Sequence, residues 1–300
     1  MALPSSERAR ALLALGCVQL LFGIQYVAAK RVLEVIPPKP WALIRAGTAG
    51  FLLLAIVLAR RLPFPPGSDL VKLAGLALLG VAINQYLFVE GLHRTTPAHS
   101  ALINCMIPVL VLLMAAALGR ERVTLRRVGG IATTFLGILV LIGVEKLDLH
   151  AATVVGDALT FMNAFSYSWF LVLGKPVMER QRAFVATALL LAMGGAWLTL
   201  VGGRGLVALP WGEIPGRIWL LGAVIVLGPT IGAYGLNTYA LARVDSSVVA
   251  LFVYVQPVIA AVLSIATGYE TPSFRLFASA AIVFLGMSVA LRPRPAIGSA

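Results

Sequence analysis

Long apolar stretches recur along the whole chain, and each is about as long as a membrane-spanning helix. A window of about 19 residues separates ten such stretches, with short segments rich in Pro, Gly and charge between them. They lie near 11–29, 41–59, 70–91, 97–118, 127–144, 153–174, 183–202, 218–241, 246–267 and 272–291. The pattern predicts an all-α integral membrane protein that crosses the bilayer ten times.

The composition leaves little room for anything outside the membrane. Of the 300 residues, 60% are hydrophobic and 12% charged, against about 25% charged in an ordinary soluble domain. Ten spans of about 20 residues leave only short loops, so residues 1–300 are expected to form a single membrane domain. Cys17 and Cys105 lie in separate apolar stretches, which gives no disulfide framework and no paired-cysteine metal or redox site.

The basic residues follow the pattern of a membrane topology. With the N-terminus inside, the inner segments hold 15 Lys and Arg and the outer segments hold 8, and Arg45 lies within a span. This bias predicts that both termini are cytoplasmic. Because the net charge of +12 lies in short loops, no nucleic-acid partner is expected; the first stretch is interpreted as a retained span, not a cleaved signal peptide.

The chain repeats itself when it is shifted by 149 positions. Pro108 then meets Pro257, the Gly-x-Glu at 119–121 meets that at 268–270, and the Phe-Leu-Gly at 135–137 meets that at 284–286. We expect a first five-helix unit at 9–146 and a second at 152–292. Since five is an odd number, the second unit enters the membrane in the opposite orientation, which is typical of secondary transporters with a site near the midplane.

These repeated motifs carry a family resemblance. TPAHSALINCMIP (96–108) is followed by Gly119-Arg120-Glu121, and DSSVVALFVYVQP (245–257) by Gly268-Tyr269-Glu270. In these motifs, and in Arg45 early in the second span, the chain resembles EamA-type members of the drug/metabolite transporter superfamily. The resemblance implies two inverted five-helix repeats around a central cavity, lined mainly by the first, third, fourth, sixth, eighth and ninth helices, and transport of amino acids or similar metabolites.

Polar side chains near the middle of these same spans are the candidate substrate ligands. Inside a bilayer a polar group needs a partner or a water-filled cavity; the alternative is that they form hydrogen bonds between helices. The candidates are Gln19, Gln25, Tyr26, Asn84, Gln85, Asn104, Asn163, Tyr167, Trp169, Tyr234, Asn237, Tyr254 and Gln256.

Five further residues are candidates for kinks or gating. Pro108 and Pro257 each remove a helical hydrogen bond and free a carbonyl one turn earlier. Glu121 and Glu270 follow the fourth and ninth spans, where they can pair with a neighbouring Arg or cap the next helix. Arg45 is expected to extend outward from near the end of its span, where it can join an ion-pair gate with Lys30, Glu34, Glu90 and Asp157; the alternative is that these are solvated charges at the membrane interface.

The rival functions need residues that the sequence does not offer. A membrane enzyme would need a metal motif or an acid/base group beside a nucleophile, and no metal or cofactor is expected. A phosphate-ester or nucleotide-sugar antiporter would need several central cations, but only Lys30, Arg45 and Lys175 come near. A drug or cation efflux protein would need a membrane carboxylate that is not evident at midplane.

The sequence therefore favours a bacterial inner-membrane exporter or exchanger of amino acids or related metabolites. It would work by alternating access, as a monomer or homodimer, with a small-molecule substrate and the lipid bilayer as its partners.

Overall fold

The computed structural model describes residues 5–119, 124–142 and 152–291, and these form ten consecutive helical crossings. In order they are α1 (Ser5–Leu33), α2 (Pro38–Ala59), α3–η1–α4 (Gly67–Ala77, Leu78–Ile83, Asn84–Arg94), α5–α6 (Pro97–Ile103, Met106–Ala117), α7 (Leu125–Ile142), α8 (Ala152–Met178), α9 (Ala183–Val207), α10–η3–α11 (Gly216–Ile225, Val226–Gly232, Ala233–Leu241), α12–η4–α13 (Ser246–Leu251, Phe252–Val255, Gln256–Ala266) and α14 (Phe274–Leu291). The predicted all-α membrane fold is confirmed.

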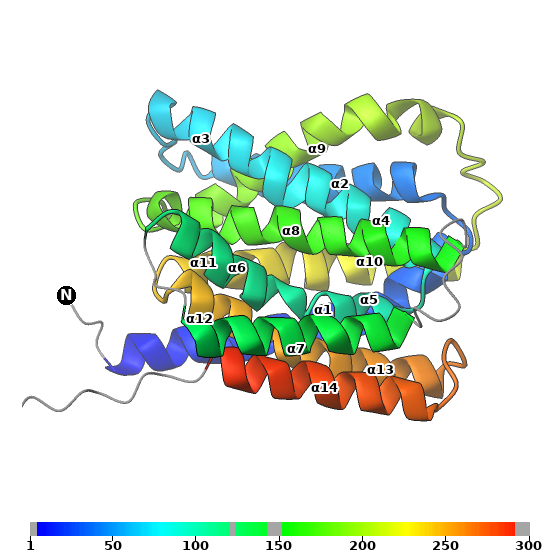
Figure 1. Ribbon diagram of the computed structural model, residues 1–300. Coiled ribbons are helices and arrows are strands. Elements are labelled where there is room, and N and C mark those ends of the chain that lie inside the picture. The colour runs from blue at the N-terminus through cyan, green and yellow to red at the C-terminus, as the bar shows by residue number, and fades with distance from the viewer. Residues whose placement is uncertain (1–4, 120–123, 143–151, 292–300) are drawn as a thin grey trace, which may run out of the picture.

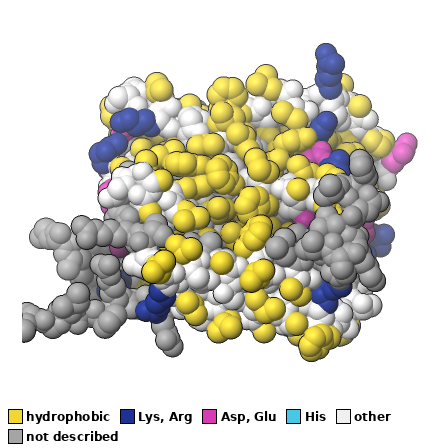
Figure 2. Space-filling view, viewed as in Figure 1, with side chains coloured by type: hydrophobic (Ala, Val, Ile, Leu, Met, Phe, Trp, Pro, Cys, Tyr) yellow, Lys and Arg dark blue, Asp and Glu magenta, His cyan; other side chains and the backbone are white. Residues whose placement is uncertain are grey.

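The helices lie side by side and run back and forth along one direction (Figure 1). The start of α1 and the end of α14 lie at the same end of the bundle. Within the described residues, seven crossings are long and apolar enough to span a membrane, while α7 and α14 contain shorter apolar segments. The face in Figure 2 is apolar in the middle, with Lys and Arg toward its two ends, as expected for a protein that crosses a bilayer.

The two halves pack against each other with an approximate two-fold relation. The second crossing packs on the seventh (α2 on α9), and the fifth on the tenth (α7 on α14). The third crossing contacts the sixth through α4 and α8, and its counterpart, the eighth, contacts the first through α11 and α1. Each of these contacts is reproduced when the halves are exchanged, which agrees with the internal repeat in the sequence.

Both halves leave regular α-geometry at equivalent places. The π-helical segments η1 and η3 overlap under the 149-residue shift. Likewise, the fourth crossing is interrupted at Asn104, and the ninth by the 3₁₀ segment η4, which includes Val253. Each interruption lies four residues before a repeated proline, Pro108 or Pro257, which has no N–H for the usual α-helical bond. The Asn104 carbonyl accepts from Ile107 N instead, at 3.0 Å.

Close backbone approach between helices is made possible by glycine. A Cβ atom on Gly50 of α2 would lie 2.5 Å from the Cα atom of Ala192 on α9. Small residues at such positions let membrane helices pack at short range. The contact between α2 and α9 therefore depends on the absence of a side chain at Gly50.

We expect Gly50→Val to lower the stability of the protein by about 1–3 kcal/mol, because the new side chain overlaps the backbone of α9. The measurement is the midpoint of thermal unfolding in detergent. Gly75→Val is the matched control, since no atom lies within 4 Å of a Cβ at Gly75. Equal midpoints for the two variants would contradict this account of the packing.

Candidate functional site

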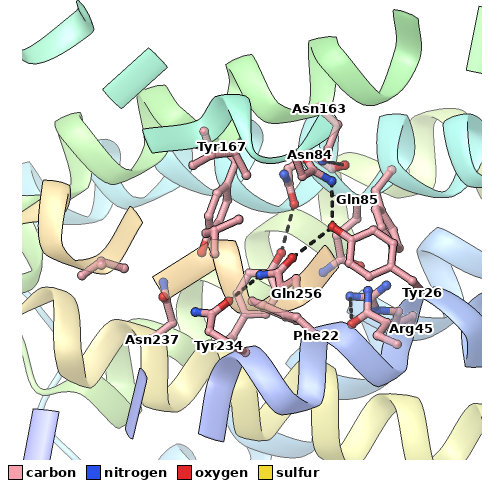
Figure 3. Close-up of a pocket in the computed structure, with 17 residues that line it drawn as sticks. Phe22, Tyr26, Arg45, Asn84, Gln85, Asn163, Tyr167, Tyr234, Asn237 and Gln256 are labelled. Atoms are coloured by element: carbon pink, nitrogen blue, oxygen red, sulfur yellow. Dashed lines mark hydrogen bonds between the residues drawn. The ribbon is translucent and has the colours of Figure 1, made fainter. Parts of the chain in front are cut away.

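A cavity of about 60 Å³ lies at the centre of the bundle, and side chains from both halves line it (Figure 3). The lining side chains are amides, phenols, one guanidinium and a few apolar groups, with no carboxylate among the described residues. They are Gln19, Phe22, Gln25 and Tyr26 of α1; Arg45 of α2; Asn84, Gln85 and Phe88 of α4; Asn104 and Ile107; Asn163 and Tyr167 of α8; Tyr234 and Asn237 of α11; and Val249, Val253 and Gln256.

Eleven of the thirteen predicted substrate ligands lie around this cavity, and Trp169 and Tyr254 do not. Trp169 is two positions beyond Tyr167, and Tyr254 is two positions before Gln256. Two positions correspond to about 200° around an α-helix and about 240° around a 3₁₀ helix, which are separations of about 160° and 120° between the two side chains. A residue two positions from one that faces the cavity therefore points away from it.

One chain of hydrogen bonds links three crossings across the cavity. The side-chain amide of Asn104 donates to the Tyr26 hydroxyl at 2.8 Å, and this hydroxyl donates to Gln256 Oε1 at 3.0 Å. The Gln256 amide in turn donates to Gln19 Oε1. The chain orients all four side chains, but Asn104 Oδ1 is left buried without a partner among the described residues.

The π-helical segment η1 supplies backbone acceptors to two other helices. The Leu79 carbonyl accepts from Ser166 Oγ of α8 at 2.7 Å. The Tyr234 hydroxyl of α11 lies 3.1 Å from the Gly80 carbonyl and 3.3 Å from Asn84 Oδ1. These bonds attach the sixth and eighth crossings to the third and hold Asn84 and Tyr234 at the cavity.

Arg45 lies in the interior, not at the end of its span. Its side chain is 2% exposed; Nε donates to Thr230 Oγ1 at 2.8 Å, and Nη2 donates to Gln25 Oε1 at 3.3 Å. The guanidinium carbon lies 5.9 Å from the centre of the Phe88 ring. Arg45 Nη1 finds no partner among the described residues. The expectation that Arg45 extends outward is therefore wrong, because its acceptors lie deeper in the bundle.

The groups expected to form an ion-pair gate with Arg45 are engaged elsewhere. Lys30 donates to the carbonyls of Leu92, His93 and Thr95, which close the end of α4. Glu34 pairs with Arg31, and Glu90 with Arg94. Asp157 accepts from Thr95 Oγ1 at 2.6 Å and lies 3.3 Å from His99 Nδ1. In the described structure Arg45 is held by neutral acceptors and forms no ion pair with these groups; a gating role for Arg45 stays a prediction.

Of the remaining candidates for gating, the two prolines are buried in helices, Glu270 lies in a turn, and Glu121 lies outside the described residues. Pro108 and Pro257 are buried one turn after the two helix interruptions. Glu270 lies in the turn between α13 and α14, partly buried, with Oε2 unpaired within the described structure. A gating role for these four residues stays a prediction.

Several buried polar atoms at the cavity have no protein partner. Besides Arg45 Nη1 and Asn104 Oδ1, both Oε1 and Nε2 of Gln85 are unsatisfied within the described structure. A buried unpaired donor or acceptor is costly, so these atoms require water or a ligand. Together they offer a positively charged donor, a neutral donor and two neutral acceptors. The described residues contain no cluster of His, Cys, Asp and Glu suited to a metal ion.

Because the sequence candidates were chosen among polar side chains, the apolar residues that line the cavity were not predicted. Phe22, Phe88, Ile107, Val249 and Val253 also face the cavity. Helical periodicity was the available signal, because Phe22 is three residues after Gln19 and four before Tyr26. The cavity therefore combines its polar atoms with aromatic and aliphatic surface.

Comparison with known proteins agrees with this architecture. The model of the EamA-like transporter family matches residues 9–143 and again 154–292. The chain belongs to the EamA-like transporter family. The family match confirms the resemblance to the drug/metabolite transporter superfamily. The protein is therefore a membrane transporter, not an enzyme.

Relatives and a solved structure extend along nearly the whole EamA chain. An "uncharacterized transporter" of Archaeoglobus fulgidus is 26% identical over 264 residues, covering 87% of this chain and 90% of the relative. The "uncharacterized inner membrane transporter YedA" of Escherichia coli strain K12 is 27% identical over 282 residues, covering 93% and 90%. A solved crystal structure aligns with a TM-score of 0.69 at 22% identity, covering 94% of this chain and 96% of the other, which supports the fold alone.

We expect Thr230→Val to destabilise the EamA protein by about 1–3 kcal/mol, because it leaves the buried Nε of Arg45 without its acceptor. The check is a double-mutant cycle on thermal or denaturant unfolding, in which Arg45→Met should remove most of the effect. Thr199→Val is the control, since Thr199 is exposed and bonds only within α9. An unchanged effect of Thr230→Val in the Arg45→Met background would count against the Arg45–Thr230 bond.

Proposed function

We propose that this EamA transporter exports or exchanges amino acids, or related small metabolites that carry a carboxylate, across a bacterial inner membrane. The observation that carries the proposal is the Arg45 guanidinium, buried beside the central cavity with Nη1 unpaired and no carboxylate among the described residues that line the cavity. A substrate carboxylate would supply the missing negative charge. Charge-assisted hydrogen bonds of this kind are among the strongest in proteins.

The other unsatisfied atoms favour a zwitterion. Asn104 Oδ1 and Gln85 Oε1 are buried acceptors without partners in the described structure, and an ammonium group donates three hydrogen bonds. Phe22, Phe88 and Tyr167 add aromatic surface to the same cavity, which suits an apolar or aromatic side chain. The lining thus offers a complement to each part of an amino acid.

The charge at the cavity disfavours the rival substrates. Lys30 is engaged by three backbone carbonyls, and Lys175 pairs with Glu179 at 2.9 Å. Arg45 is therefore the one cation on the described cavity lining, too little for a doubly charged phosphate ester. The absence of a carboxylate on the same lining disfavours a cationic drug.

Alternating access fits the repeated architecture. Inverted repeats in transporters generally move by rocking one unit against the other around a fixed site. The paired interruptions before Pro108 and Pro257 occur at Asn104 and Val253, which both face the cavity. We propose that these interruptions are hinges, so that opening at either end changes the shape of the substrate site.

We expect a subset of amino acids to raise the midpoint of thermal unfolding of the purified protein. Saturation at about 100 times the dissociation constant stabilises by roughly 2.7 kcal/mol. The methyl ester and the decarboxylated amine of the same amino acid should give no shift, because they lack the carboxylate that pairs with Arg45. Arg45→Gln should weaken binding of the free amino acid about 10- to 100-fold, in line with roughly 1.5–3 kcal/mol for a charged hydrogen bond.

Counterflow of the labelled amino acid into proteoliposomes then measures transport. Arg60→Gln is the control, because Arg60 is exposed on the surface and lies outside the cavity. Equal binding of esters and free acids would overturn the role of Arg45. Stabilisation by phosphate esters alone would favour the antiporter reading.

We also propose that both termini are cytoplasmic, as the distribution of Lys and Arg indicates. The test introduces a single cysteine into a protein in which Cys17 and Cys105 have been replaced. Gly212→Cys places it in the loop between α9 and α10, and Ser68→Cys places it at the start of α3; both positions are exposed. A membrane-impermeant maleimide applied to intact spheroplasts should label only the first variant. Labelling of Ser68→Cys alone would reverse the orientation.

A further inference from the structure

A second, larger hollow of about 590 Å³ lies on the side of the bundle, between α2, the end of α9 and α10–η3. Trp41, Trp211 and Trp219 line one end of it, and Leu52 and Leu227 the other. We call this hollow the lateral groove. It shares only helices, and no lining residue, with the central cavity, so the inference below does not rest on the proposed substrate.

The lateral groove has the dimensions of one leaflet. From Trp41 to Leu52 there are eleven residue steps along α2, or about 16 Å of helix. That length is close to half of the roughly 30 Å hydrocarbon core of a bilayer. Leu52 is 40% and Leu227 61% exposed, so the deep end of the groove opens toward the lipid, not toward water.

Small residues leave the floor of the groove open. Gly47 of α2 and Gly222 of α10 both line it. The nearest atom to a Cβ on Gly47 would be Leu43 Cδ1 at 3.7 Å, and Gly222 faces the ring of Trp41. An elongated apolar guest such as an acyl chain suits this groove, because its lining is mostly apolar and follows α2 from Trp41 to Leu52.

The shallow end of the groove carries the polar features of a membrane interface. The rings of Trp211 and Trp219 stack, with centroids 5.3 Å apart and an interplanar angle of 5°. Trp41 is 1% exposed, and its indole N–H has no acceptor among the described residues. Trp side chains at this depth commonly meet lipid head groups, and the ester carbonyls of a phospholipid lie just below those head groups.

Three exposed cations lie on the ends of the helices that line this end of the groove. Lys39 is in the first turn of α2, Arg204 in the last turn of α9 and Arg217 in the first turn of α10. The start of α2 and the end of α9 are in close contact, because a Cβ on Gly202 would lie 2.6 Å from the Lys39 carbonyl oxygen. The three cations favour an anionic head group.

We propose that the lateral groove is a binding site for one anionic phospholipid. One acyl chain fills the groove beside Gly47, an ester carbonyl accepts from Trp41 Nε1, and the head group pairs with Lys39, Arg204 and Arg217. The lipid thereby fills the space between the second and eighth crossings, which belong to different halves of the protein.

The test uses the full-length protein in detergent, stripped of lipid and titrated with phosphatidylglycerol or with phosphatidylcholine of identical chains. Native mass spectrometry should detect one phosphatidylglycerol per chain that survives activation, and little phosphatidylcholine. The triple variant Lys39→Gln, Arg204→Gln, Arg217→Gln should weaken phosphatidylglycerol binding on the order of 100-fold. Gly47→Leu, whose Cβ would be 3.7 Å from its nearest neighbour, adds a side chain to the lining of the groove and should abolish retention of both lipids.

A matched control variant replaces three exposed cations at the opposite end of the bundle by glutamine: Arg10→Gln, Arg60→Gln, Arg182→Gln. This variant should retain phosphatidylglycerol like the parent protein. The proposal is overturned if the parent retains neither lipid, if the control triple variant loses binding equally, or if Gly47→Leu binds normally. A dimer of this chain that Gly47→Leu dissociates would also overturn it, since a second copy would then occupy the groove.

Discussion

Hydrocarbon offers a peptide group no hydrogen-bond partner, and this constraint decides how a polar centre can be built inside a helical membrane protein. A regular α-helix uses its interior carbonyls for its own hydrogen bonds, and a neighbouring helix reaches them only as a second donor, as Trp197 Nε1 does at the Ala74 carbonyl. The described chain leaves α-geometry at η1, at η3 and at the interruptions of the fourth and ninth crossings. At η1 two backbone carbonyls serve other helices, because those of Gly80 and Leu79 accept from Tyr234 and Ser166.

The same departures support Arg45. The Thr230 hydroxyl in η3 donates to the carbonyl of Ile225, the last residue of α10, at 2.9 Å. The same hydroxyl oxygen accepts from Arg45 Nε. Arg45 is thus fixed in place without a carboxylate, and its charge stays available to the cavity. A carboxylate partner would have neutralised that charge and made the pair a structural element. The neutral acceptors hold the guanidinium ready for a ligand that brings the negative charge.

How well the sequence predicts each feature depends on how far apart along the chain the interacting residues are. The spans and the repeat depend on local hydrophobicity and on repeated motifs, so they could be read directly, and Pro108 and Pro257 indicated kinks in the fourth and ninth crossings. The π-helical segments were not predicted, and η1 contains no proline. Residues such as Trp169 and Tyr254 could have been set aside by helical periodicity, since each lies two positions from a cavity residue. The position of Arg45 could not be predicted, because its acceptors Thr230 and Gln25 are 185 and 20 residues away.

The two halves share their backbone but not their cavity side chains. Under the 149-residue shift, Gln85 corresponds to Tyr234 and Asn104 to Val253, and all four line the cavity. A symmetric backbone allows equivalent movements to open either end, whereas the substrate that we propose, an amino acid, has chemically different groups that require an asymmetric site. The proposed hinge at Asn104 also belongs to the chain of hydrogen bonds through Tyr26 and Gln256. A ligand that binds Asn104 Oδ1 therefore acts on the hinge itself, which links occupancy of the site to the movement that releases it.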